Sequence, residues 1–273
     1  MYGRVRAKAD GSLLRENVMG TASTATISGI VAVIGMMSPG MVQAAELTVL
    51  TSQGVVSAVR DLAPAFERAS GHKVLVSFEV GPGLMNKVNS DAPADVVTHY
   101  PEAIDDLMKK GKVLTGTGVV IARAGIGVAV RTGAPKPDIS SPDAFKRSML
   151  ASKSIAYSRA GASGLYVAKL MERLGIADEM KARTKLVDGV PVAEVVAKGE
   201  AEIGMQQINV ILPVAGIEYV GPLPSELQDY VMFSAGVLAV SKQPEAAIAM
   251  VKFMSAPEAA SLIRKSGMEP AAR

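Results

Sequence analysis

The sequence contains near its middle the long apolar segment Val119-Val-Ile-Ala-Arg-Ala-Gly-Ile-Gly-Val-Ala-Val-Arg131. No helical pattern separates this segment from the loop before it, and its length would let it leave one hydrophobic core and enter another. We interpret it as a strand that crosses between two parts of the protein. The apolar segment 231–240 is then the strand that returns.

On both sides of this segment the sequence alternates between strand, polar or glycine-rich loop, and helix, which is typical of α/β proteins with parallel strands. Strands are expected at 46–50, 73–78, 95–99, 154–158, 184–187 and 202–206. Helices are expected at 55–69, from Leu84, at 101–110, from Ser141-Pro142, at 165–174 and at 190–197, with two more opening at 241–244 and 255–258. Two lobes joined by two passes of chain predict a cleft between them.

The first 44 residues have the pattern of an export signal, with a basic start, an apolar core at 27–37 and the small-x-small end Val42-x-Ala44. A retained membrane anchor is the alternative, but the core has 11 residues, against the roughly 20 that a spanning helix needs. We expect cleavage near Ala45 and a soluble periplasmic protein. The remaining chain is predicted to form one lobe from residues 45–124 and 215–273, and a second from residues 125–214.

The composition excludes several classes of protein. The 273 residues include no cysteine and two histidines, so a disulfide framework or a thiolate metal site is excluded, and we expect no metal and no cofactor. Residues 1–44 hold four basic and two acidic side chains, which leaves 25 basic and 24 acidic ones in the remainder. That balance, with 4% aromatic residues, argues against nucleic-acid binding. We expect a monomer.

Six stretches of the chain are informative together: Ala45-Glu-Leu-Thr-Val-Leu50, Leu62–Phe66, Ser70-Gly-His-Lys-Val74, Ala92-Pro-Ala-Asp-Val96, Lys198-Gly-Glu-Ala-Glu-Ile-Gly204 and Pro244-Glu-Ala-Ala247. In this order they resemble the molybdate-binding periplasmic proteins of ABC transporters. The resemblance implies the type 2 periplasmic binding fold, in which two lobes, each a mainly parallel sheet flanked by helices, close on a ligand in the cleft between them. It also implies a small anionic ligand and a partner permease in the inner membrane.

The sequence departs from this family at the residues that bind the oxyanion. Gly54 and Gly81 stand where the family has serines, and Gln207 stands where it has a tyrosine. Ser52 and Gln53 lie beside the first of these positions, and backbone amides remain at Gly81-Pro82-Gly83. The resemblance therefore implies a conserved scaffold with a changed ligand.

A glycine-rich turn that leads into a helix, Arg159-Ala-Gly-Ala-Ser163-Gly164, offers free N–H groups to an anion. Its guanidinium can hold a carboxylate through two parallel hydrogen bonds, so we expect an organic mono-, di- or tricarboxylate rather than molybdate. The alternatives are a solvated loop charge for Arg159 and a helix N-cap for Ser163.

Further candidates follow other strands, because ligands in open α/β sheets collect beyond the carboxyl ends of the strands. His99 and Tyr100 follow one strand, and Gln206 and Gln207 end another, where alternation predicts that one of the two glutamines faces the ligand. Arg123 on the crossing strand must reach the cleft or water. His72 is expected on the surface, and His99 is either a structural histidine or a hydrogen-bonding or proton-transfer group.

Two functions remain open. The first is a solute receptor for an ABC importer, which closes its lobes on an organic anion without chemistry. The second is an enzyme on the same scaffold, since aconitate isomerases resemble this family and move a proton along a tricarboxylate to interconvert its cis and trans isomers. In that case His99 and Arg159 would be catalytic, with Arg123 and Ser163 as ligand contacts.

Overall fold

The computed structural model describes residues 44–79 and 81–271, so the predicted export signal lies outside the described residues apart from Ala44. The strands are β1 (Glu46–Ser52), β2 (Lys73–Glu79), β3 (Val96–His99), β4 (Val119–Arg131), β5 (Ile155–Ser158), β6 (Thr184–Val187), β7 (Ile203–Gln207), β8 (Ile217–Pro222), β9 (Tyr230–Val237) and β10 (Glu269–Pro270). The α-helices are α1 (Val56–Ser70), α2 (Gly81–Asn89), α3 (Pro101–Lys109), α4 (Pro142–Ala151), α5 (Ala162–Arg173), α6 (Ala177–Lys181), α7 (Val192–Ala197), α8 (Ile208–Ile211), α9 (Pro244–Met254) and α10 (Ala260–Lys265). Two short 3₁₀ helices are η1 (Ser225–Leu227) and η2 (Pro257–Ala259).

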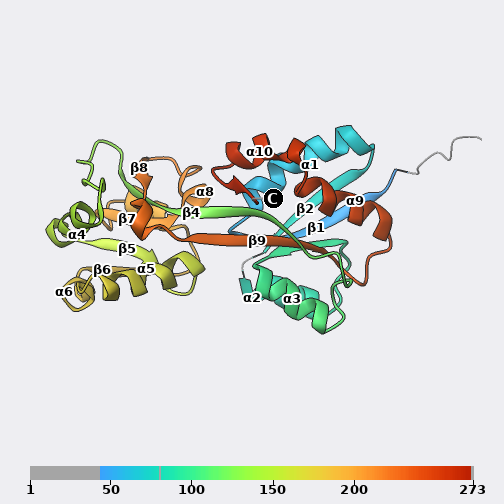
Figure 1. The fold of residues 1–273 in the computed structure, drawn as a ribbon, viewed down its shortest axis with the longest axis horizontal. Coiled ribbons are helices and arrows are strands. Elements are labelled where there is room, and N and C mark those ends of the chain that lie inside the picture. Colours follow the sequence, from blue (N-terminus) through green and yellow to red (C-terminus); the bar gives the residue numbers. More distant parts are fainter. Residues whose placement is uncertain (1–43, 80, 272–273) are drawn as a thin grey trace, which may run out of the picture. The chain divides into compact units, whose positions relative to one another are not determined.

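Strand β4 crosses between two sheets, as its sequence predicts. Its first half, Val119–Gly125, pairs antiparallel with β9, and its second half, Ile126–Val130, pairs antiparallel with β7. Figure 1 shows β4 and β9 running beside each other between two groups of helices. The prediction of two connecting strands is therefore confirmed, with the returning strand at 230–237.

The two sheets give the protein two lobes. The first lobe contains β2, β1, β3, β9 and the first half of β4, and the second contains the second half of β4 with β7, β5 and β6. The pairs β1–β2, β1–β3, β5–β6 and β5–β7 are parallel. The predicted two-lobed α/β fold is confirmed by these pairings. Strand β8 also pairs with the second half of β4, so the second sheet includes residues 217–222. The exact residue boundaries of the two lobes remain a prediction from the sequence.

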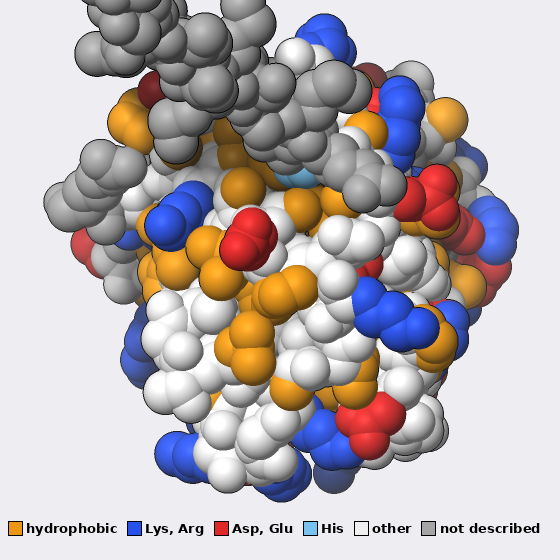
Figure 2. All heavy atoms as spheres, turned by 90° about the vertical axis from the view of Figure 1, so that its right-hand side faces the viewer, with side chains coloured by type: hydrophobic (Ala, Val, Ile, Leu, Met, Phe, Trp, Pro, Cys, Tyr) orange, Lys and Arg blue, Asp and Glu red, His pale blue; other side chains and the backbone are white. Residues whose placement is uncertain are grey.

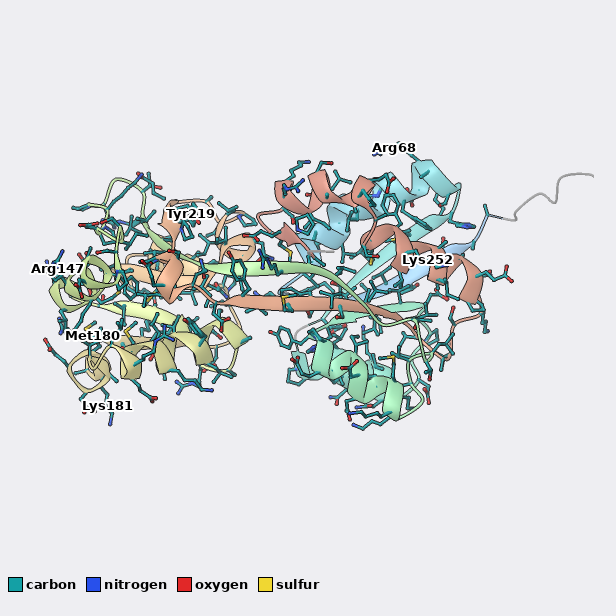
Figure 3. The ribbon with its side chains drawn as sticks, in the orientation of Figure 1. Arg68, Arg147, Met180, Lys181, Tyr219 and Lys252 are labelled. Atoms are coloured by element: carbon teal, nitrogen blue, oxygen red, sulfur yellow. The ribbon has the colours of Figure 1, made fainter. Side chains whose placement is uncertain are left out.

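Each lobe has its own hydrophobic core. In the first lobe, α1 buries Ala58, Val59, Leu62 and Phe66, which recur at helical spacing, in a cluster that also contains Phe233 of β9. In the second lobe, the core combines β4, β5 and β7 with α4, α5 and α6. On α6, Met180 points into this core and Lys181 points away from it (Figure 3).

Several local expectations need correction. The helix expected from Leu84 begins three residues earlier, at Gly81, since proline is tolerated in the first helical turn, where its missing N–H has no partner to lose. At 255–258, where a helix was expected to open, Ser255 does not cap it, because its hydroxyl donates back to the carbonyl of Lys252. The helix expected from Ser141-Pro142 is confirmed as α4, and the Ser141 hydroxyl accepts from the Ala144 amide at its start.

His72 was expected on the surface but is 7% exposed. Its Nδ1 accepts a hydrogen bond of 3.1 Å from the Ala45 amide, and its ring packs against Phe66. The histidine therefore holds the start of β1 against the turn before β2.

Charged side chains of both signs are interspersed over the face drawn in Figure 2. This distribution follows from the near balance of basic and acidic residues in the sequence. Over residues 44–79 and 81–271, no single helix is long and apolar enough to cross a membrane, and only α9 taken together with 257–265, a pair bent by 61°, meets both criteria.

Candidate functional site

A cavity of about 520 Å³ lies where residues of both lobes meet at the ends of their strands. It is lined by Ser52, Gln53, Gly54, Pro82, His99, Tyr100, Ser158, Ala160, Gly161, Ser163, Asp188, Gly189, Gln206, Gln207 and Val210. Most of these residues lie at the carboxyl ends of β1, β3, β5 and β7 or in the loops that follow β1, β3, β5 and β6, the edge at which ligands of α/β proteins collect. The volume lies within the range of about 300–1,000 Å³ that is usual for small-molecule sites.

Several helices begin at this cavity. Residues 52–54 lead into α1, Pro82 lies in the first turn of α2, Tyr100 precedes α3, and Gly161 precedes α5. Within the described part of the chain, no side chain caps the N-terminus of α1, α3 or α5, whereas Ser141 caps α4. Uncapped N–H groups and the positive ends of the helix dipoles favour an anion here.

The cavity wall has little formal charge. Among the described residues, neither lysine nor arginine borders it, and Asp188 is its one acidic side chain. Arg159 lies outside the wall, where its Nε donates to Asp188 Oδ2 at 2.7 Å and both side chains are 58% exposed. The guanidinium predicted to grip the ligand is thus already paired at the rim.

His99 borders the cavity and makes a specific local hydrogen bond. Its Nδ1 accepts from the Tyr100 backbone N–H at 2.8 Å, so the neutral ring carries its proton on Nε2. Burial lowers the pKa of His99, which keeps the ring neutral. His99 is therefore equipped to donate a hydrogen bond from Nε2, whereas accepting a proton would require breaking the bond to Nδ1.

The lowered pKa of His99 predicts a stability change with pH. The unfolded chain binds a proton near the ordinary histidine pKa of about 6.5, and the folded chain does so only at lower pH. Between these two values the unfolded state holds more protons, so we expect the free energy of unfolding to fall as the pH drops below about 6.5. Urea unfolding should show a smaller fall for His99→Gln than for the unchanged protein, and a ring-proton NMR titration with its midpoint at or above 6.5 would contradict this.

Tyr100 contacts the second lobe across the cavity, whereas Ser163 and the two glutamines make their hydrogen bonds within that lobe. The backbone N–H of Ala162 in α5 donates to the Tyr100 hydroxyl, and burial raises the pKa of this tyrosine. Ser163 is 1% exposed, and its hydroxyl makes a long contact of 3.5 Å with Gln207 Oε1. Both glutamines border the cavity, although alternation predicted one, and Gln206 Oε1 accepts from the Val192 amide at 2.8 Å.

Two of the predicted site glycines, Gly54 and Gly164, have packing roles in this structure. A Cβ on Gly54 would lie 2.6 Å from the Phe233 ring, and a Cβ on Gly164 would lie 1.7 Å from the Ser158 carbonyl oxygen. Gly54 borders the cavity, but Gly83 and Gly164 do not, and Gly81 is the first residue of α2. The close approach of α5 to β5 thus accounts for a glycine at position 164 without any role in ligand binding.

Arg123 does not reach the cavity. Its Nε donates to Glu269 Oε2 at 2.8 Å, and its guanidinium lies 4.1 Å from the centre of the Tyr230 ring. Glu269 belongs to β10, which pairs with β4 at this position. The charge on the crossing strand is satisfied by a neighbouring strand.

Sequence reasoning missed four residues of the wall, namely Ser158, Asp188, Gly189 and Val210, and it named Pro82, Ala160 and Gly161 only as parts of the stretches 81–83 and 159–164. Asp188 directly follows β6, so the rule that ligands collect beyond strand ends could have identified it. In the described part of the chain, no three histidine, aspartate or glutamate residues come together as a metal site would need.

Residues 47–269 match the family described as bacterial extracellular solute-binding protein. This chain belongs to that family. It is 36% identical to a Pseudomonas protein named aconitate isomerase over 230 residues, which cover 82% of this chain and 87% of the relative. It is 26% identical to molybdate-binding protein ModA of Azotobacter vinelandii over 232 residues, 82% of this chain and 90% of the relative.

The fold of this solute-binding protein is also that of solved relatives. The periplasmic molybdate-binding protein of Azotobacter vinelandii aligns with a TM-score of 0.66 at 21% identity, over 81% of this chain and 98% of that chain. The resemblance to molybdate-binding proteins and to aconitate isomerases, inferred from the sequence, is confirmed by these matches.

Proposed function

We propose that this solute-binding protein is an exported periplasmic receptor that binds a small organic polycarboxylate in the 520 Å³ cavity and delivers it to an ABC permease. The observation that carries the proposal is the convergence of uncapped helix N-termini from both lobes on one cavity. Such N-termini stabilise negative charge without a resident cation. A relative named for a tricarboxylate, at 36% identity, favours an organic anion.

Several donors are available to the carboxylate groups of this ligand. The amides at the start of α5, the Nε2–H of His99 and the Nε2 of Gln207 can each donate from the cavity wall. Donors from both lobes would be brought onto one ligand by closure about β4 and β9, which are the strands that connect the lobes. Lobe closure is thus the proposed mechanism of capture.

A thermal-shift and calorimetry screen tests this function. The purified protein would be mixed with molybdate, sulfate, and di- and tricarboxylates that include cis- and trans-aconitate. A cognate ligand at about 100 times its Kd should stabilise the fold by about 2.7 kcal/mol, which is a Tm rise of roughly 5–10 °C for a chain of this size. Stabilisation by molybdate or sulfate and by no carboxylate would contradict the proposed ligand class.

Isomerisation of aconitate is the second candidate, favoured by the relative that carries that name. In this candidate His99 takes and returns the proton and Arg159 holds a carboxylate. The Nδ1 bond of His99 and the ion pair of Arg159 with Asp188 both count against these roles. Proton NMR of cis-aconitate mixed with the protein separates the candidates: conversion to the trans isomer that His99→Ala abolishes supports the enzyme, and binding without conversion supports the receptor.

A further inference from the structure

The wall of the proposed anion site includes an acidic side chain, Asp188, whose negative charge is not explained by anion binding alone. Asp188 follows β6, and the chain turns at Gly189, which has a φ of +74°. Its Oδ2 accepts from Arg159 Nε at 2.7 Å, and its Oδ1 has no hydrogen-bond partner among the residues the structure describes. One carboxylate oxygen of Asp188 is thus available to a ligand.

The rest of the wall does not neutralise this oxygen. The neighbouring polar groups are hydroxyls, amides and the imidazole of His99, whose lowered pKa keeps it uncharged. A ligand carboxylate placed against Asp188 would meet a like charge and is disfavoured, whereas a ligand group that donates a hydrogen bond is favoured. Asp188 therefore favours a ligand that presents a hydrogen-bond donor to it over a ligand that presents a carboxylate.

Arg159 decides which kind of donor fits. Its guanidinium is within hydrogen-bond distance of the same carboxylate, so a ligand ammonium at Asp188 would also face a positive charge. A neutral hydroxyl avoids this repulsion and still donates to the free oxygen. Because Arg159 holds Oδ2, Oδ1 is the oxygen of Asp188 that can accept from the ligand.

We propose that Asp188 makes the site selective for hydroxy-carboxylates, whose hydroxyl donates to its free oxygen, over carboxylates of the same skeleton without that group. This inference rests on the proposed function, because it assumes that small carboxylates bind in the cavity. It narrows the proposed ligands from carboxylates in general to hydroxy-carboxylates.

Isothermal titration of the full purified chain with matched ligands tests the proposal. Malate and succinate differ by one hydroxyl, as do citrate and tricarballylate, and aspartate presents an ammonium in place of the hydroxyl of malate. In at least one of the two pairs, the hydroxyl ligand should bind at least about tenfold more tightly, which is the size of one hydrogen bond to a charged group. Aspartate should gain no such advantage over succinate.

Variants assign the preference to a residue. In Asp188→Asn, the ratio between the paired ligands should fall to about threefold or less, with tighter binding of succinate or tricarballylate than in the unchanged protein. Asp105→Asn on α3 removes one exposed carboxylate outside the cavity and should leave the ratio unchanged. In Arg159→Gln, the hydroxyl preference should persist, because the free oxygen of Asp188 remains in the wall. Unchanged unfolding midpoints confirm that the variants fold.

The outcomes separate two kinds of failure. If the unchanged protein binds no carboxylate at all, the proposed function fails and this inference fails with it. If carboxylates bind but neither pair differs, if Asp188→Asn keeps the preference, or if Arg159→Gln loses it, the role of Asp188 is overturned while the receptor function stands. If aspartate binds more tightly than succinate, the group favoured at Asp188 is an ammonium and not a hydroxyl, and the proposed role of Asp188 is also overturned.

Discussion

Gly164→Ala is expected to destabilise the protein by about 3 kcal/mol, at the upper end of the usual cost of overpacking. The added Cβ would lie 1.7 Å from the carbonyl oxygen of Ser158 and 2.6 Å from its carbonyl carbon. Both atoms are backbone at the end of β5, so relief requires α5 to move away from the sheet. Urea or thermal unfolding measures the effect, and a fall in Tm of about 6–12 °C corresponds to this energy for a chain of this size.

Gly221→Ala is the matched control for this substitution. The added Cβ on β8 would meet the Cδ1 of Ile139 at 3.4 Å, an ordinary contact with a flexible side chain. We expect a change below about 1 kcal/mol. Equal effects of the two substitutions would show that the approach of α5 to β5 is looser than the structure has it.

Much of the fold follows from patterns that act over short stretches of sequence. Apolar residues at helical spacing identify α1, and an uninterrupted apolar run identifies β4 as the connection between the lobes. Elements without such a pattern were missed: α6 has five residues, and β8 has no buried face, since its residues are half-buried or exposed. The sequence predicted the start of α2 at Leu84 and not at Gly81, because glycine and proline have low helix propensity and local propensity does not include the packing of Leu84 and Val88.

The site could be predicted where the position in the chain alone fixes the geometry. Residues that follow β1, β3, β5 and β7 were found because parallel strands bring their carboxyl ends to one edge. The direction of a long charged side chain is not fixed in this way. Arg123 pairs with Glu269, 146 residues away, and Arg159 pairs with Asp188, 29 residues away, and no local pattern encodes either contact.

The glycines of the site illustrate the same difference. A glycine in a loop before a helix predicts a close approach of backbone, but the sequence does not say what approaches. At Gly54 it is the ring of Phe233, and at Gly164 it is the backbone of β5. Gly161 differs from both, because it borders the cavity and precedes α5 in an extended conformation that any residue can adopt.

Gly161→Asp is therefore expected to remove anion binding while α5 remains folded. An aspartate at this N-cap would accept hydrogen bonds from the amides of Ser163 or Gly164 and would place a negative charge where the ligand carboxylate is proposed to bind. We expect affinity for the tightest carboxylate of the screen to fall at least about 100-fold, or about 2.7 kcal/mol. Helix stability should be unchanged or improved by up to about 1 kcal/mol, since carboxylates are good N-caps.

Two further substitutions at the same position separate the causes. Gly161→Ala adds the same Cβ, 2.9 Å from the Ser158 hydroxyl that accepts from the Gly161 amide, without a cap or a charge, and should change affinity by less than about fivefold. Gly161→Asn caps the same amides without the charge and should lie between the other two variants, at about tenfold. This order of affinities, measured by calorimetry, follows only if the ligand uses the free amides of α5; an aspartate variant that binds as tightly as the alanine variant would place the anion elsewhere in the cavity.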